Sequence, residues 1–366
     1  MNLSPFKLER YFAKYEFNTE YLLCSSDCEA MSIADLLALE EGASEKFQSV
    51  WLGYTESQGS PSLRKEISKV YETIQSEEIL VHAGAEEAIF LFMHAVLKQG
   101  DHVIVHAPCY QSLIEIAKSI GCDVSLWLAR EENNWALDLD ELKKLLRPNT
   151  KAIIINTPHN PTGYLMSRAD FDFVNRFAQE NDLLLFCDEV YRESEYDPST
   201  CLPAACDMGE HAVSLGVTSK TYGLAGLRIG WIATKNKRIY NAMASLKDYT
   251  TICNSAPSEF LAEVAMRNRH KLIERNLGII KSNLAVMDEF FIRHSSIFNW
   301  IRPQAGSMGF PKLLNGGIED FCDKVVREVG VLLLPGTMYD DTGNHFRVGL
   351  GRKNLPQAVD RLEKFL

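Results

Sequence analysis

One lysine of this chain stands in a setting that a surface lysine does not need. Lys220 follows the hydroxyl residues Thr218 and Ser219 in the stretch SLGVTSKTYGLAGLRIGW, between two apolar runs, and Arg228 closes the glycine-rich segment behind it. An amine in such a place can attack an aldehyde or remove a proton, provided that its surroundings lower its pKa. A solvated glycine-rich connection is the alternative reading, and the rest of the sequence has to decide between the two.

Other polar residues follow apolar runs in the same way. Asp188 ends the run LLLFCD, where an ionised carboxylate requires a cation or a strong donor, and Tyr191 comes three residues later. The rigid loop NTPHNPTG presents the amide of Asn160. Tyr110 follows the run HVIVHAP and is either a core residue or a face on which a flat ring stacks. A structural aspartate paired with an arginine is the alternative at Asp188.

The segment VHAGAEEA places Gly84, Ala85 and Glu86 between an expected strand and an expected helix. Free backbone N–H groups and the positive end of the helix dipole suit a phosphate there, although a plain turn has the same appearance. Taken together, these residues match a flat, phosphorylated, basic heterocycle that forms a Schiff base. Pyridoxal phosphate is such a ligand, and it stabilises carbanions as an electron sink. The interpretation assigns its aldehyde to Lys220, its ring nitrogen to Asp188, its phenolic oxygen to Asn160 and Tyr191, its ring face to Tyr110, and its phosphate to Ser219, Arg228 and the amides of Gly84, Ala85 and Glu86.

The elements that must position these residues alternate along the chain. Short apolar runs at 78–84, 102–108, 123–129, 151–158, 182–189, 211–217 and 228–234 predict strands without polar alternation. Between them, segments with helical period are predicted at 85–98, 110–120, 139–147 and 168–180, with Asp138 and Ser167 as caps of the last two. This order predicts an α/β fold with a mostly parallel sheet between helices, whose functional residues gather past the carboxyl ends of the strands.

Length and composition set the domain organisation and exclude several classes of protein. A chain of 366 residues is long for one core, so we expect an N-terminal arm at 1–40 that packs on the small domain or on a partner subunit, a large domain at 41–255 and a small α/β domain at 256–366. The net charge of −11 disfavours a nucleic-acid partner, and no apolar run is long enough to span a membrane. Nine scattered cysteines without C-x-x-C pairs, and histidines without metal-ligand spacing, favour a cytoplasmic protein without a metal site.

The motifs NTPHNPTG, CDEVY, TSKTYGLAGLRIGW and FRVGLGR, in this order, resemble the class I/II aminotransferase family of fold-type-I pyridoxal-phosphate enzymes over about residues 50–352. The resemblance implies that Lys220 forms the internal aldimine, with Asp188, Asn160, Tyr191, Ser219 and Arg228 as cofactor ligands. The segment WLGYTESQGSPSLRKEI is similar to one whose tyrosine, here Tyr54, reaches the phosphate of the neighbouring subunit, which implies a homodimer. Arg347 matches the arginine that holds the substrate α-carboxylate in a two-pronged contact, whereas a carboxylate of the small domain is its alternative partner.

Two segments depart from the family pattern and leave the reaction open. The N-terminal stretch YLLCSSDCEAMSIADLL lacks the usual glycine-proline start, so Ser26, Asp27 and Cys28 are all candidates for the position over the substrate. The segment PQAGSMGFPKL resembles a branch that includes capreomycidine-synthase-like enzymes, which act on arginine derivatives. We expect transamination between an α-amino acid and a 2-oxo acid; the alternative is a lyase, cyclase or decarboxylase with an arginine-derived substrate. Asp27 and Glu29 either suit a cationic side chain or are solvated loop acids.

Overall fold

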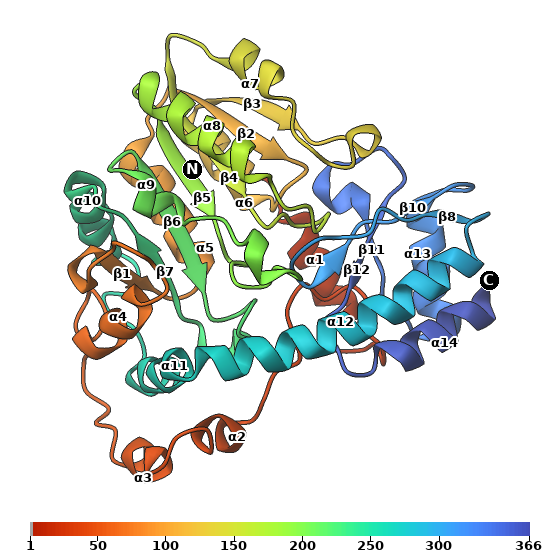
Figure 1. Ribbon diagram of the computed structural model, residues 1–366, viewed down its shortest axis with the longest axis horizontal. Helices are drawn as coiled ribbons and strands as arrows, with labels where there is room; N and C mark the ends of the chain where they lie inside the picture. Colours follow the sequence, from red (N-terminus) through yellow and green to blue (C-terminus); the bar gives the residue numbers. More distant parts are fainter. Residues whose placement is uncertain (1–2) are drawn as a thin grey trace.

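Seven strands form the central sheet of the computed structural model, which describes residues 3–366 (Figure 1). From edge to edge they are β1 (Ile79–His82), β7 (Gly230–Ala233), β6 (Ala212–Val217), β5 (Leu184–Asp188), β4 (Thr150–Asn156), β2 (His102–Ala107) and β3 (Asp123–Leu128). All neighbours from β6 to β3 are parallel, whereas β7 is antiparallel to both β6 and β1. Because two antiparallel pairings restore the direction, β1 runs with the parallel strands. The mostly parallel sheet expected from the sequence is confirmed.

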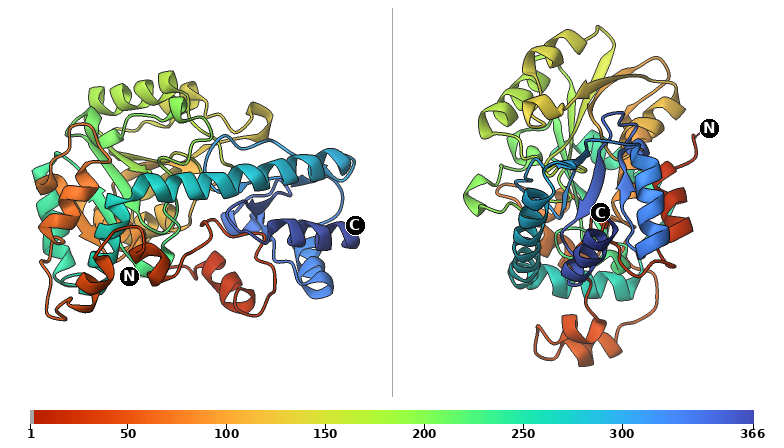
Figure 2. Two further views of the ribbon diagram at one scale, coloured as in Figure 1. Left: turned by 60° about the horizontal axis from the view of Figure 1, so that its bottom comes forward. Right: turned by 90° about the vertical axis from the view of Figure 1, so that its right-hand side faces the viewer.

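Helices cover both faces of this sheet (Figures 1 and 2). One face packs against α5 (Ala85–Val96), α6 (Ser112–Ile120) and α10 (Lys237–Lys247); the other packs against α7 (Leu139–Leu145), α8 (Arg168–Glu180) and α9 (Ala205–Met208). Strand β4 shows the reason, since Ile154 is buried on the first face while Ile153 and Ile155 are buried on the second. A strand covered on both sides therefore shows no polar alternation.

Strand β3 differs from the other strands in its burial. It lies at the edge of the sheet, and while Trp127 is fully buried, Leu126 and Leu128 are 41% and 37% exposed. The apolar run at 123–129 therefore indicated a strand correctly but not a doubly covered one, because the sequence of one strand does not reveal which strands are at the edge.

The expected caps of two helices are present. The carboxylate of Asp138 accepts hydrogen bonds from the N–H groups of Asp140 and Glu141 at the start of α7. At the start of α8, the hydroxyl of Ser167 accepts one from the N–H of Asp170 and donates one to its carboxylate. Both contacts satisfy N–H groups that a helix leaves free in its first turn, which fixes where each helix begins.

A third group of helices packs beyond β1 and β7. It consists of α2 (Ile33–Leu37), α3 (Ala43–Gln48), α4 (Pro61–Ser68) and α11 (Ala256–Arg267), which bury apolar side chains together with Val81 and Trp231. Helix α11 thus packs on the larger unit, and the division of the chain at 255/256 stays a prediction.

The smaller unit begins along α12 (Arg269–Arg293), which extends from the large unit to the C-terminal elements (Figure 1). It contains a pair of short strands, β8 (Phe298–Asn299) with β10 (Lys312–Leu313), and a three-stranded sheet of β11 (Leu334–Pro335), β12 (Phe346–Gly349) and β9 (Met308–Gly309). Helices α13 (Ile318–Val329) and α14 (Leu355–Phe365) complete its core together with α12.

The first residues form an arm on this smaller unit. In α1 (Lys7–Tyr15), the hydroxyl of Tyr11 donates to the carbonyl of Leu333 at 2.8 Å, and the hydroxyl of Tyr15 donates to the carboxylate of Asp323 at 2.8 Å. Helix α1 therefore packs against the second unit of its own chain, and the role expected for the whole arm at 1–40 stays a prediction.

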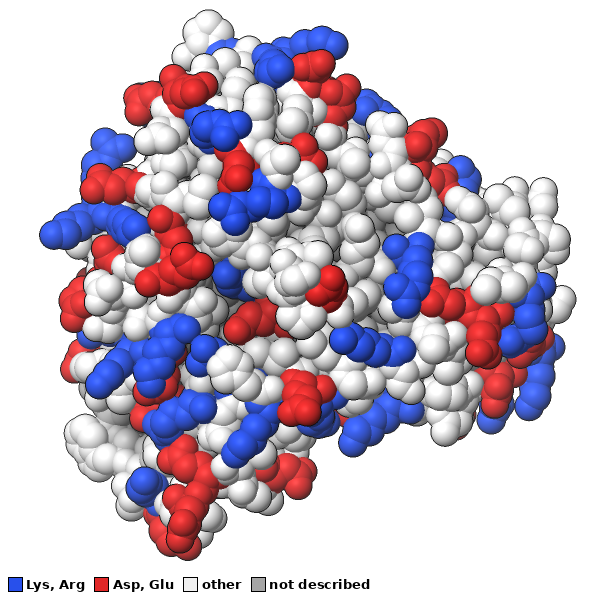
Figure 3. Space-filling view, viewed as in Figure 1, with Lys and Arg blue, Asp and Glu red and all other residues white. Residues whose placement is uncertain are grey.

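The surface carries both signs of charge. On the face shown in Figure 3, lysine and arginine side chains intermingle with aspartate and glutamate side chains. Within residues 3–366, the helices all lack the combination of length and apolar composition that a membrane crossing requires.

Candidate active site

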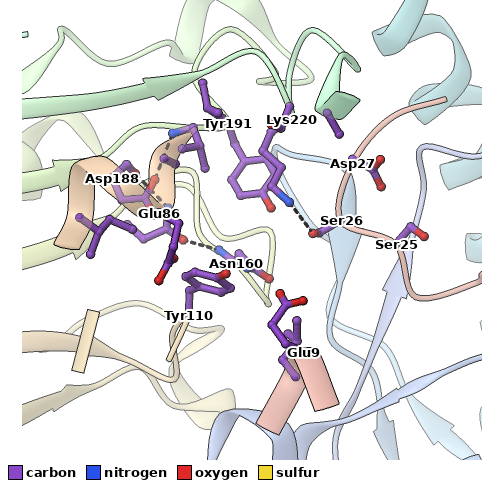
Figure 4. A pocket seen from close by; sticks show the side chains of 18 of the residues that line it. Glu9, Ser25, Ser26, Asp27, Glu86, Tyr110, Asn160, Asp188, Tyr191 and Lys220 are labelled. Atoms are coloured by element: carbon purple, nitrogen blue, oxygen red, sulfur yellow. Dashed lines mark hydrogen bonds between the residues drawn. The ribbon is translucent and has the colours of Figure 1, made fainter. Parts of the chain in front are cut away.

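A cavity of about 340 Å³ lies where the carboxyl ends of β4, β5 and β6 meet the arm and β12 (Figure 4). Its walls come from both units, so residues far apart in the sequence face one another. Most of the residues singled out in the sequence line it. They are Asp27, Ala85, Glu86, Tyr110, Asn160, Asp188, Tyr191, Ser219, Lys220, Arg228 and Arg347, while Gly84 adjoins Ala85.

Lys220 follows the end of β6 and points across the cavity to the arm (Figure 4). Its Nζ atom donates a hydrogen bond to Oγ of Ser26 at 3.0 Å. Burial lowers the pKa of this amine, and the charge of Asp27 opposes that shift. The amine is thereby brought nearer to the state in which it can act as a nucleophile or base at neutral pH.

Asp188 ends β5, on the strand beside β6. Its Oδ1 atom accepts a hydrogen bond from the N–H of Val190 at 3.2 Å. Burial raises the pKa of this carboxyl to about 7, against the smaller lowering effects of that hydrogen bond and of the Lys220 charge. A ligand that brings a positively charged N–H to Asp188 would restore the ionised form.

The loop after β4 holds the amide of Asn160 in place. The side chain of Asn156 accepts a hydrogen bond from the N–H of Asn160 at 2.7 Å and donates one to the carbonyl of Asp188 at 2.9 Å. The Asn160 Oδ1 atom in turn accepts hydrogen bonds from the hydroxyl of Tyr339 at 3.1 Å and from Nη1 of Arg347 at 3.2 Å. The strand ends of the large unit are thereby tied to the smaller one.

Arg347, on β12, is 1% exposed and lines the cavity. Its Nε atom donates to the carbonyl of Cys24 at 2.9 Å, and its Nη1 atom also contacts the hydroxyl of Tyr339. Within residues 3–366, Arg347 has no carboxylate in salt-bridge distance, and Nη2 makes no hydrogen bond. Within the described residues, the carboxylate of the small domain that was the alternative partner of Arg347 is therefore absent. The Nη2 atom of the guanidinium stays free to bind an anion.

The start of α5 forms an anion-binding corner. Gly84 is its N-cap residue with φ +91°, and no side chain caps the first N–H groups. The positive φ favours glycine here, and a Cβ atom at Gly84 would lie 2.6 Å from Nη2 of Arg228, so the backbone comes close to the tip of that side chain. The buried hydroxyl of Ser219, which lines the same cavity, has no hydrogen-bond partner in residues 3–366. The side chain of Glu86 turns instead to the hydroxyl of Ser112.

Comparison with known proteins decides the family. Residues 22–362 match the family model of aminotransferase class I and II, which covers nearly the whole chain. The chain belongs to this family.

Solved structures and curated relatives agree with this assignment. A pyridoxal-phosphate-dependent aminotransferase from Streptococcus suis 89-1591 is 33% identical, with a TM-score of 0.94 over 100% of this chain and 98% of its own. The pyridoxal-phosphate-dependent cyclase OrfR is 28% identical, with a TM-score of 0.91 over 100% and 98%. The aspartate aminotransferase of Pyrococcus abyssi is 27% identical over 90% of this chain and 87% of its own, and the capreomycidine synthase of Streptomyces vinaceus is 26% identical over 93% and 88%. The chain is an enzyme of the aminotransferase family, and its cofactor is pyridoxal phosphate.

The polar groups that line the cavity of this enzyme match those of pyridoxal phosphate. The hydroxyls of Tyr191 and Ser219 are buried and without hydrogen-bond partners in residues 3–366, although buried polar groups are normally paired. The anion-binding corner at Gly84 and Arg228 suits a phosphate, and the buried carboxyl of Asp188 suits a protonated ring nitrogen. These groups are left unsatisfied by the protein and match what the cofactor presents.

Three residues that were singled out in the sequence do not line the cavity. Tyr54 lies outside the cavity and is 86% exposed, and its contact with a second subunit stays a prediction. Cys28, one of three candidates over the substrate, is 1% exposed and does not line the cavity, whereas Ser26 and Asp27 do. Glu29 does not line it either; its carboxylate accepts a hydrogen bond from the N–H of Lys353.

The sequence reasoning missed one wall of the site. Helix α1 and the residue after it contribute Leu8, Glu9, Phe12 and Glu16 to the cavity, and Tyr339 supports Arg347 from behind. The segment KLERYFAKYE does carry apolar residues at helical spacing, which could have indicated an amphipathic helix. Its sequence gives no sign of what either face contacts.

Proposed function

We propose that the chain is a cytoplasmic aminotransferase that moves an amino group between an α-amino acid and a 2-oxo acid, with Lys220 as the residue that binds the aldehyde of the cofactor. The observation that carries this proposal is the pairing of Lys220 with Arg347 across one cavity. Arg347 is buried without a carboxylate partner in residues 3–366, so a carboxylate must come from the substrate.

Each residue then has a defined task. Arg347 binds the α-carboxylate and thereby places the substrate Cα–H bond beside the amine of Lys220. The Nζ atom of Lys220 would accept the proton that leaves the substrate Cα. Pyridoxal phosphate supplies the electron sink for the carbanion that this leaves. Asp188 keeps the proton on the ring nitrogen.

The other residues orient the ring. Tyr191 and Asn160 would hold its phenolic oxygen, and Tyr110 would supply a face for the ring. Ser219, Arg228 and the N–H groups of residues 84–86 would hold the phosphate, where the dipole of the 12-residue helix α5 favours negative charge.

A homodimer is part of the proposal. Trp51, Leu52 and Tyr54 are each at least 80% exposed, and Tyr249 is 90% exposed. The hydroxyl of Thr55 donates to the carbonyl of Asn254 at 2.9 Å, which joins the first segment to the loop that follows Tyr249. Exposed apolar side chains gathered in this way are typical of interfaces, and a second copy that covers them would bring Tyr54 to the other subunit's phosphate.

A second reaction class has support of its own. The similarity to the cyclase OrfR and to capreomycidine synthase favours elimination or cyclisation on an amino acid as the alternative to transamination. Both reaction classes begin with loss of the Cα proton, so the same residues serve either.

The deciding experiment follows the amino group. Holoenzyme is mixed with each of a panel of L-amino acids in the absence of a 2-oxo acid, and the 2-oxo acid, ammonia, carbon dioxide and aminated cofactor are measured. Transamination predicts equal amounts of 2-oxo acid and aminated cofactor, limited to one turnover per site. Release of ammonia over many turnovers, or consumption of the amino acid with neither ammonia nor 2-oxo acid formed, would instead establish elimination or cyclisation, with the cofactor unchanged. Release of carbon dioxide would establish decarboxylation, which begins with loss of the carboxylate. Lys220→Ala serves as the control that lacks the base.

A further inference from the structure

The wall of the cavity formed by the arm is acidic. Glu9 of α1, Glu16 directly after α1 and Asp27 all line it. Figure 4 shows Ser26 and Asp27 across the cavity from Asp188, with Glu9 directed into it from α1. None of these three carboxylates has a task in the chemistry described above.

Only one of the three is neutralised by the protein. Both oxygens of Asp27 accept hydrogen bonds from Nη2 of Arg352, at 3.0 and 3.1 Å. Glu9 and Glu16 form neither hydrogen bonds nor ion pairs through their carboxylates in residues 3–366. Burial raises the pKa of Glu16, and the negative charges of Asp27 and Glu9 raise it further, while the positive charges of Arg352 and Lys220 lower it by less, as expected of carboxylates that share one region.

The positive groups of the cavity are already engaged. Lys220 is assigned to the aldehyde, Arg228 to the phosphate and Arg347 to the α-carboxylate, and the cavity is lined by no other lysine or arginine of the described residues. The same cavity holds the unpaired hydroxyl of Tyr191, a residue that is 2% exposed, so the carboxylates lie at the rim of a ligand site: Glu16 is half-buried and Glu9 is exposed.

We propose that Glu9 and Glu16 select substrates whose side chain carries a positive charge, such as a guanidinium or an ammonium group. This inference rests on the proposed function and names the substrate class for it. The α-carboxylate binds Arg347, and the cationic end of the side chain reaches the carboxylates of the arm. A dicarboxylic amino acid would place its second carboxylate against Glu9 and Glu16, so aspartate and glutamate are disfavoured despite the similarity to aspartate aminotransferases.

The test compares two substrates of nearly equal shape and different charge. L-arginine carries a guanidinium, and L-citrulline has a neutral urea in its place. We expect a kcat/KM at least roughly tenfold higher for arginine, since a close opposite charge at a partly solvated site contributes about that factor. The double variant Glu9→Gln/Glu16→Gln should lower the arginine-to-citrulline ratio by about tenfold or more without a loss for citrulline. Glu20→Gln, an exposed residue of the arm outside the cavity, is the matched control and should leave the ratio unchanged.

A binding measurement separates this inference from the reaction itself. 5-Guanidinopentanoate and 5-ureidopentanoate have the carboxylate and the side-chain group but no α-amine, so they can bind holoenzyme without reacting. Calorimetry should give tighter binding of the guanidino acid to the wild type, and this preference should be lost in the double variant. Equal binding of the two acids, or a preference unchanged in the double variant, would overturn the inference. Failure of every amino acid to transfer its amino group would count against the proposed function while leaving this comparison intact.

Discussion

The carboxyl of Asp188 should destabilise the cofactor-free protein, and its replacement by asparagine should stabilise it. Burial raises the pKa of Asp188 from 3.8 to about 7, so the folded protein holds the ionised form at a cost. Asparagine has the same shape, can still accept the hydrogen bond from the N–H of Val190, and carries no charge that burial would penalise.

The size and sign of the effect follow from the two pKa values. A carboxyl with a raised pKa in the folded state is neutral in both states below pH 3.8 and contributes no penalty there. The penalty grows as pH rises from 3.8 and is complete above 7. At about 1.4 kcal/mol per unit of pKa, it reaches about 2 kcal/mol at pH 5 and about 4 kcal/mol at pH 8. Both figures are net values, since the raised pKa of Asp188 already includes the attraction to the charge of Lys220.

Calorimetric unfolding of cofactor-free protein measures this directly. With an unfolding entropy of about 2 cal/mol/K per residue, about 4 kcal/mol corresponds to a rise in Tm of roughly 5 °C at pH 8, and the rise should be about half as large at pH 5. Asp360→Asn, on the exposed side of α14, should leave Tm unchanged at both pH values. Holoenzyme with Asp188→Asn should lose turnover by orders of magnitude, because the ring nitrogen has lost its anionic partner. A Tm that does not rise, or a rise that is the same at both pH values, would refute the assignment of a costly buried carboxylate.

Further predictions concern the cofactor, the substrate and the second subunit. Borohydride should attach the cofactor covalently to the wild type and not to Lys220→Ala, and peptide mapping that finds another lysine would remove Lys220 from its role. Arg347→Lys keeps the charge but loses the planar fork in which Nε and Nη1 contact Cys24 and Asn160 while Nη2 stays free for the substrate carboxylate, so kcat/KM for amino acids should fall roughly 30- to several-thousand-fold while cofactor affinity stays the same. Amines without a carboxylate should react equally well with both proteins, and equal losses for both kinds of amine would show that Arg347 is structural. Tyr54→Phe should weaken cofactor binding without dissociating the dimer in sedimentation, whereas a fully active wild-type monomer would contradict the shared site.

The elements of the large unit could be predicted because their signals are local. A few residues are enough to indicate a strand such as β4, which is buried on both faces, or a helix start such as the one that Ser167 caps. The residues at the strand ends followed from the same rule, since parallel strands bring their carboxyl ends to one edge of the sheet. The position of β3 at the edge of the sheet depends on strand order, which no single segment encodes.

The wall of the site made by the arm could not be predicted, because it depends on contacts between distant segments. Glu9 and Glu16 gain their importance only where α1 meets the smaller unit, more than 300 residues along the chain, as the hydrogen bond from Tyr11 to Leu333 shows. The place of Tyr339 beside the site could not be predicted for the same reason, since its hydrogen bond to Asn160 joins the two units.

The glycines of the segment FRVGLGR let the backbone of the arm pack directly against the strand that carries Arg347. A Cβ atom at Gly349 would lie 2.1 Å from the carbonyl oxygen of Ser25, and one at Gly351 would lie 2.3 Å from that of Asp27. Glycine at both positions therefore lets the arm lie directly along the segment that follows Arg347, as the hydrogen bond from the N–H of Gly349 to the carbonyl of Leu23 shows.

The same approach fixes both ends of the substrate site. The carbonyl of Cys24 accepts a hydrogen bond from Arg347, and two residues later the hydroxyl of Ser26 meets the amine of Lys220. One short stretch of backbone thus contacts both Arg347, the proposed carboxylate-binding group, and Lys220, the proposed base. Gly349 and Gly351 do not line the cavity, but they allow the close backbone approach on which both contacts depend.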